Sequence, residues 1–305
     1  MRLDVASASP LTFGDGSPVH AASAIAPFGD GWLVVQDDAT HAAWWRAGAV
    51  TPVRVVEPVA GLEVFSAAAG TKHLKPDFEA AVAVPMAGAD AVLLLGSGST
   101  AARTRASLVT LGASGPRHAV ADLGPLYRDV ALALGLHDDQ LNLEGACLAG
   151  DRLRWFQRAN RAAGAPTACV DVDLAAVLAA VTGEGGVRRV ELGDVRHYDL
   201  GTVGGVPLAV TDALALADGR VLVSAAAEDT PNAVDDGRVA GSALALLDDD
   251  GVLATVAVPA PGPGPYKVEG LALREATADG LRLLAVTDAD DPAVPSERLE
   301  LHLRW

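Results

Sequence analysis

The chain has 305 residues, half of them apolar, and 23 basic against 39 acidic side chains give a net charge of −16. A surface this acidic repels phosphate backbones and anionic lipid, which argues against nucleic acid and membrane surfaces as partners and makes a cation the easier counter-species. The length suits two ordinary domains or one large all-β barrel or propeller.

The distribution of apolar residues along the chain predicts where the protein is located. The N-terminus, Met1-Arg2-Leu3-Asp4-Val5, has no apolar segment of the kind found in signal peptides. No run reaches the roughly 18 apolar residues of a membrane helix. The two cysteines, Cys147 and Cys169, lie in apolar runs and predict buried thiols, not a disulfide framework. We therefore expect a cytoplasmic protein.

Five similar strand pairs follow one another along the chain. The clearest is an apolar run over 144–149, a Gly150-Asp151 turn and a second run over 152–158, which is the pattern of a β-hairpin. Aligning the five pairs on a polar residue at the start of the first strand gives anchors at Ser23, Glu79, Glu144, Asp212 and Glu269. The steps between anchors exceed the roughly 40–50 residues of a propeller blade. Insertions explain the excess, and those over 125–134 and 174–181 have the apolar spacing of short helices.

Two further strand-like runs follow each of the first four pairs. They cover 41–46 and 50–56, then 104–111 and 117–123, then 167–172 and 187–195, then 240–247 and 252–258. The fifth pair is followed by one run, 298–304, while the N-terminal run 2–6 has no blade of its own. If the N-terminal strand completes the last sheet, the ring closes and no open edge is left. The sequence therefore predicts an all-β, five-bladed β-propeller with residues 1–305 as one domain. Six blades are the alternative, if a degenerate copy lies within 57–73 or 123–141.

In such a hairpin the start of the first strand and the end of the second lie on one face. This places Glu79, Glu144, Asp212 and Glu269 around one end of the central channel, with Ser23 completing the ring. The same face receives candidate ligand-binding residues from the hairpin ends and entry loops: Lys75, Asn142, Arg158, Lys267, Asp229 and Asp288.

Carboxylates that converge on one channel raise one another's pKa unless something compensates their charge. One solution is a hard cation such as Ca²⁺, which takes six to eight oxygen ligands. A second is ion pairing with Lys75, Arg158, Lys267 and Arg103. A third is hydrogen bonding to backbone N–H groups, which would brace the blades. The sequence leaves all three open.

Other catalytic motifs find no support. Gly-x-Ser-x-Gly, His-Glu-x-x-His and paired Cys-x-x-Cys motifs do not occur, which removes the usual signs of a serine hydrolase or a zinc site. The glycine-rich stretch 96–99 is not followed by Lys-Thr and a helix, so it predicts a tight loop and not a P-loop. The sequence identifies no catalytic residue.

Three segments carry a resemblance to known proteins: Lys75-Pro76-Asp77-Phe78-Glu79-Ala80, the pair Asn142–Ala146 and Trp155–Asn160, and Lys267-Val268-Glu269-Gly270-Leu271-Ala272. They resemble a set of uncharacterised bacterial β-propellers, distantly similar to the phytase-like esterase domain. The resemblance implies a propeller with an ester or phosphoester hydrolase ancestry and calcium as cofactor.

Two functions follow as hypotheses. In the first, the four ring acids hold a cation that activates water, while Lys75, Arg158 and Lys267 clamp an anionic substrate. In the second, a non-catalytic propeller binds a small molecule or a protein partner through the same face.

Overall fold

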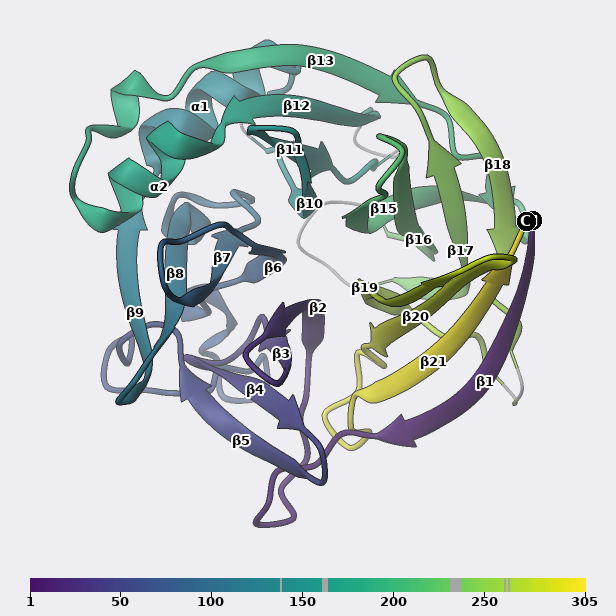
Figure 1. Cartoon of the computed structure of the whole chain (residues 1–305), viewed down its shortest axis with the longest axis horizontal. Helices are drawn as coiled ribbons and strands as arrows, with labels where there is room; N and C mark the ends of the chain where they lie inside the picture. The colour runs from purple at the N-terminus through teal and green to yellow at the C-terminus, as the bar shows by residue number, and fades with distance from the viewer. Residues whose placement is uncertain (138, 161–163, 231–236, 261, 263) are drawn as a thin grey trace.

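A computed structural model describes residues 1–305 except 138, 161–163, 231–236, 261 and 263. Five antiparallel sheets stand around a common axis, and in each sheet the strands follow one another from the axis out to the rim (Figure 1). The predicted five-bladed β-propeller is confirmed, and the alternative of six blades is wrong.

The first four blades each keep one contiguous stretch of chain. The first contains β2 (Ala22–Phe28), β3 (Gly31–Gln36), β4 (His41–Arg46) and β5 (Ala49–Arg54). The second contains β6 (Phe78–Ala83), β7 (Asp90–Gly96), β8 (Arg105–Gly112) and β9 (Gly115–Asp122). The third contains β10 (Leu143–Ala149), β11 (Arg152–Gln157), β12 (Thr167–Asp173) and β13 (Leu192–Tyr198). The fourth contains β14 (Thr202–Val203), β15 (Val206–Ala215), β16 (Val221–Asp229), β17 (Arg238–Leu247) and β18 (Val252–Ala257).

The fifth blade joins the two ends of the chain. It contains β19 (Val268–Thr277), β20 (Gly280–Thr287), β21 (Glu297–Arg304) and, at its rim, β1 (Arg2–Pro10). The antiparallel register runs from Arg2 opposite Arg304 to Pro10 opposite Glu297. The N-terminal strand thus closes the ring as predicted, and it is longer than the predicted 2–6.

Apolar side chains that alternate along the strands fill the spaces between neighbouring blades. The largest cluster joins the second and third blades and includes Leu93, Leu95 and Trp155, all fully buried. The inner strands approach so closely that a Cβ on Gly145 would lie 2.6 Å from the Asp212 Cα, and Gly145 has a φ of +66°. Only glycine meets both demands, which explains its place after the ring acid of the third blade.

Helices α1 (Gly124–Ala133) and α2 (Leu174–Thr182) lie between the outer parts of the second and third blades, where their buried side chains join the apolar cluster of these blades (Figure 1). The chain also forms the short 3₁₀ turns η1 (Lys72–Leu74), η2 (Ala101–Arg103) and η3 (Val187–Arg189). The Asp173 carboxylate caps α2 by accepting a hydrogen bond from the Ala176 N–H at 2.9 Å. Both helices fall in the predicted insertions.

The structure corrects one predicted strand and confirms the prediction for the cysteines. The strand predicted over 187–195 begins only at Leu192, because η3 takes up its first three residues. Cys147 and Cys169 are buried free thiols, as predicted. No helix in the described part of the chain is long and apolar enough to cross a membrane.

Candidate functional site

Each inner strand carries a β-bulge, which lies near the start of the strand in four blades and in the middle of β15 in the fourth blade, and each bulge holds a polar residue. The strand register shifts at Ser23 in β2, Glu79 in β6, Glu144 in β10, Thr211 in β15 and Glu269 in β19. A bulge adds an unpaired residue and re-aims its side chain. The predicted ring of anchors therefore exists, with three carboxylates and two hydroxyls.

The fourth anchor is Thr211, one residue before the Asp212 that the sequence predicted. A shift of one residue turns a side chain to the opposite face of a strand. The Asp212 carboxylate accordingly accepts the backbone N–H groups of Ala213 and Leu271, each at 2.8 Å, and is 1% exposed. Asp212 thus braces the fourth blade against the fifth, with both of its oxygens already accepting backbone hydrogen bonds.

The two hydroxyl anchors, Ser23 and Thr211, each join their own blade to the next one. Thr211 Oγ1 donates to the Val268 carbonyl at 2.8 Å, directly before Glu269. Ser23 Oγ donates to the Phe78 carbonyl at 2.6 Å, directly before Glu79. These two bonds fix the neighbouring bulge, and with it the position of the neighbouring acid.

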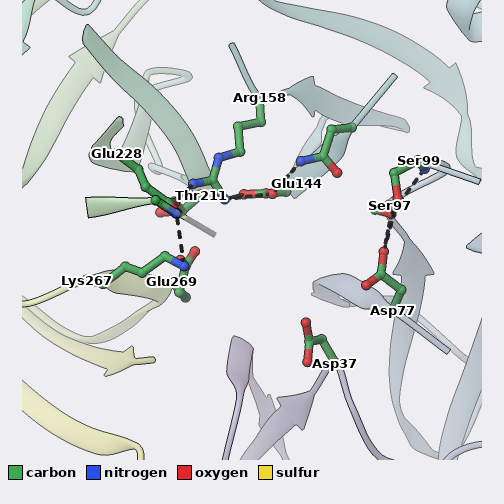
Figure 2. A network of polar contacts seen from close by, with 12 residues as sticks. Asp37, Asp77, Ser97, Ser99, Glu144, Arg158, Thr211, Glu228, Lys267 and Glu269 are labelled. Atoms are coloured by element: carbon green, nitrogen blue, oxygen red, sulfur yellow. Dashed lines mark hydrogen bonds and ion pairs between the residues drawn. The ribbon is translucent and has the colours of Figure 1, made fainter. Parts of the chain in front are cut away.

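Arg158 joins the third and fourth blades (Figure 2). Its NH1 lies 2.9 and 3.0 Å from the two Glu144 oxygens, and its NH2 bonds to Glu228 of β16. Asn142 Nδ2 donates to Glu144 at 2.9 Å. Burial raises the pKa of Glu144 to about 7, while the Arg158 guanidinium opposes this shift.

Lys267 forms a similar centre in the fifth blade. Its Nζ lies 3.2 Å from Glu269, 2.8 Å from both Asp290 oxygens and 3.6 Å from Glu228. Burial alone would lower the pKa of Lys267, but Glu269 and the other acids outweigh it and hold that pKa well above its usual value.

The third centre lies between the first and second blades. Lys75 Nζ bonds to Asp37 and lies 2.6 Å from Asp77 Oδ1. Asp77 Oδ2 accepts the Ser97 hydroxyl and lies 3.1 Å from Arg103 NH1. Asp77 has a φ of +59°, a region that Asp tolerates better than most residues, and is 2% exposed.

These three centres surround one cavity on the axis, here called the axial cavity. Its volume of about 90 Å³ is enough for an ion with several water molecules, since one water needs only about 10–15 Å³ of such a cavity. Among the described residues, eight acidic and five basic side chains line it, so acidic groups exceed basic groups by three. The carboxylates belong to Asp37, Asp77, Glu79, Glu144, Glu228, Glu269, Asp288 and Asp290, and the basic groups to Lys72, Lys75, Arg103, Arg158 and Lys267.

Glu79 is one of the acids in this excess. This side chain makes no hydrogen bond or ion pair with any residue that the structure describes. Burial, then Asp37 and Asp77, raise the pKa of Glu79 well above its usual value. One oxygen each of Asp37, Asp77 and Glu79 lies within 4.8 Å of the other two, so these residues could hold a metal ion.

Asp288, a predicted ligand-binding residue, also lines the axial cavity. Burial, then the charge of Asp290, raises the pKa of Asp288 to about 8. Lys75, Asn142, Arg158 and Lys267, all predicted, line the cavity as well. Asp229 does not: it is exposed and lines an adjoining pocket, while its neighbour Glu228 faces the axis.

From the sequence, no role was assigned to four acids that the structure brings to the axial cavity, Asp37, Asp77, Glu228 and Asp290. A usable signal lies in 75–79, where the charged residues Lys75, Asp77 and Glu79 stand at every second position. Asn142 with Glu144 and Lys267 with Glu269 repeat the same two-residue spacing, and each pair is in contact.

The comparisons with known proteins identify a family. The model of a family of unknown function, DUF6910, matches residues 71–292, and the chain belongs to that family. No curated protein matches the chain.

Among solved structures, a glycosyl hydrolase from Bacteroides ovatus is similar at 11% identity, 93% coverage of this chain, 84% of that chain and a TM-score of 0.45. A protein of unknown function from Dyadobacter fermentans is similar at 12% identity, 99% coverage of both chains and a TM-score of 0.42. A luciferin-regenerating enzyme is similar at 12% identity, 94% coverage of this chain, 78% of that chain and a TM-score of 0.41. Likenesses this distant carry no information about activity.

Proposed function

We propose that this propeller binds a small cation in the axial cavity, a hard divalent ion such as Ca²⁺, at Asp37, Asp77 and Glu79. The observation that carries the proposal is the convergence of these carboxylates within 4.8 Å, with Glu79 forming no hydrogen bond or ion pair in the described chain. Ca²⁺ accepts six to eight oxygens at about 2.3–2.6 Å. Carboxylates with water in the remaining volume fit that demand.

Lys75 holds the place of the cation when the site is free. Its ammonium group already neutralises Asp37 and Asp77, and those acids keep its pKa well above the usual value against the effect of burial. A divalent ion at Glu79 must therefore repel or displace this ammonium group. Lys75 therefore weakens cation binding, and in the free protein it offsets the charges of Asp37 and Asp77.

Binding is better supported than calcium-assisted ester or phosphoester hydrolysis. Glu144 and Glu269, expected to share the ion, are held by Arg158 and Lys267. The described lining also contains no His or Cys that could act as base or nucleophile. Hydrolysis is therefore the second candidate, and it requires the same ion to activate water.

Calorimetric titration with CaCl₂ tests the proposal. Wild type should bind one ion, Glu79→Gln should bind it at least tenfold more weakly, and Glu184→Gln, at an exposed site outside the axial cavity, should match wild type. Absence of saturable binding to wild type, or equal affinity of the Glu79 variant, would contradict the proposal. Turnover of p-nitrophenyl acetate or phosphate that needs both Ca²⁺ and Glu79 would instead establish the hydrolase.

A further inference from the structure

A second cleft lies between the first and fifth blades, at the opposite end of the strands from the axial cavity. β3 ends at Gln36 beside Asp37 of the axial cavity, whereas its first residues, Gly31 and Trp32, line this cleft. The cleft has a volume of about 580 Å³. Small-molecule sites in proteins typically measure about 300–1,000 Å³. This interblade cleft is therefore large enough for a complete small molecule, unlike the axial cavity.

One wall of the interblade cleft is aromatic. Trp32 of β3 and Trp45 of β4 stand directly opposite each other in the strand register, so their side chains share one face of the first blade. Both are half-buried. Phe13 and Leu284 add apolar surface from the loop after β1 and from the fifth blade. Half-buried indole rings on a concave wall offer flat apolar surface for a planar ligand.

Two arginines beside the cleft are stacked on indole rings and have no acidic partner, but only the ring under Arg298 lines the cleft, because Trp44 packs on the opposite face of the first blade, toward the second. Arg298 of β21 lies over the Trp45 ring at 4.5 Å, and Arg46 lies over the Trp44 ring at 4.0 Å. Neither guanidinium forms an ion pair in the described part of the chain. The Arg46 Nε is also shielded from solvent without a hydrogen-bond partner among those residues. Arg274, by contrast, is neutralised by Glu300 at 2.6 Å.

The charge of the cleft is opposite to that of the protein. Three arginines and two acids, Asp30 and Glu300, line it, which leaves one positive charge on a chain with a net charge of −16. A stacked guanidinium has a fixed orientation and presents a pair of N–H donors at its edge, which match the two oxygens of a carboxylate. The aromatic wall thus matches a planar ligand, and the unpaired donors match a ligand with a negative charge.

We propose that the interblade cleft is a second binding site, and that it takes a planar aromatic carboxylate. The ring lies against Trp32 and Trp45, and the carboxylate accepts hydrogen bonds from Arg298. This site is independent of the cation in the axial cavity, because the two share no lining residue.

Isothermal titration calorimetry of the wild-type protein with 2-naphthoate tests the chemistry of the ligand. We expect one site, and binding at least tenfold tighter than that of 2-naphthylmethanol, which keeps the rings and lacks the charge. No saturable heat up to millimolar 2-naphthoate would overturn the proposal. Equal affinity for the uncharged alcohol would also overturn it, because Arg298 would then play no part.

Variants test the location of the site. Arg298→Gln should weaken 2-naphthoate binding at least tenfold. Arg220→Gln is the matched control, because Arg220 also lies over an indole, that of Trp305 at 5.1 Å, in another blade. It should bind within twofold of wild type. Equal loss in both variants, or no loss in Arg298→Gln, would place the ligand elsewhere. The comparison of the two ligands on wild type remains decisive if Arg298→Gln does not fold.

Discussion

The Asp212→Ala variant distinguishes a structural role of Asp212 from a role as a cation ligand. The substitution removes the acceptor of two buried N–H groups, those of Ala213 and Leu271, on two different blades. Each buried donor left without a partner costs about 1–3 kcal/mol, so the free energy of unfolding should fall by about 2–6 kcal/mol. Because Asp212 does not line the axial cavity, the affinity for Ca²⁺ should stay within twofold of wild type.

Urea unfolding followed by tryptophan fluorescence measures the first effect, and calorimetry at a temperature where the variant is folded measures the second. Asp250→Ala is the control, since Asp250 is exposed in a turn of the same blade. It should change the free energy of unfolding by no more than about 0.5 kcal/mol. A loss below about 1 kcal/mol in Asp212→Ala, or a loss of Ca²⁺ affinity at unchanged stability, would refute the reasoning.

Three further predictions concern the charged groups of the axial cavity. Arg158→Gln should cost about 3–5 kcal/mol in urea unfolding because it leaves buried carboxylates unpaired, and adding Glu144→Gln should recover part of that loss; strictly additive losses would contradict the pairing. Without divalent cations, the melting temperature should fall between pH 5 and pH 8. Folded Asp288 keeps its proton up to a pKa of about 8, whereas an unfolded aspartate has lost it above about 4, so stability declines across that window. Asp288→Asn should flatten the decline, and a melting temperature that rises with pH would contradict the sign. Lys75→Gln should tighten Ca²⁺ binding at least tenfold in calorimetry by removing the competing ammonium group, and weaker binding would show that Lys75 supports the site.

The arrangement of blades was predictable because it depends on patterns that repeat. Alternating apolar runs with turn residues between them define each hairpin, and the unmatched strands at the two ends of the chain can only be satisfied by pairing with each other. The identity of the fourth anchor was not predictable. An alignment on acidic residues selects Asp212, but the bulge in β15 places Thr211 at the axis, and spacing alone does not locate a bulge.

The groups that pair with the ring acids also could not be predicted from the sequence. Ion pairing, backbone bracing and cation binding were all open, and the structure assigns the first to Glu144 and Glu269 and the second to Asp212. The deciding groups, Glu228 and Asp290, come from strand ends and loops. Asp290 reaches Lys267 from a backbone with a φ of +52°, a local conformation that residue propensities do not specify.

The cation at the axis is tested most directly by a crystal structure of the protein soaked in CaCl₂. We predict one ordered ion bonded to oxygens of Asp37, Asp77 and Glu79 at about 2.3–2.6 Å, with the Lys75 ammonium group moved away from it. An empty site with Lys75 still bridging Asp37 and Asp77, or an ion bound only outside the axial cavity, would contradict it.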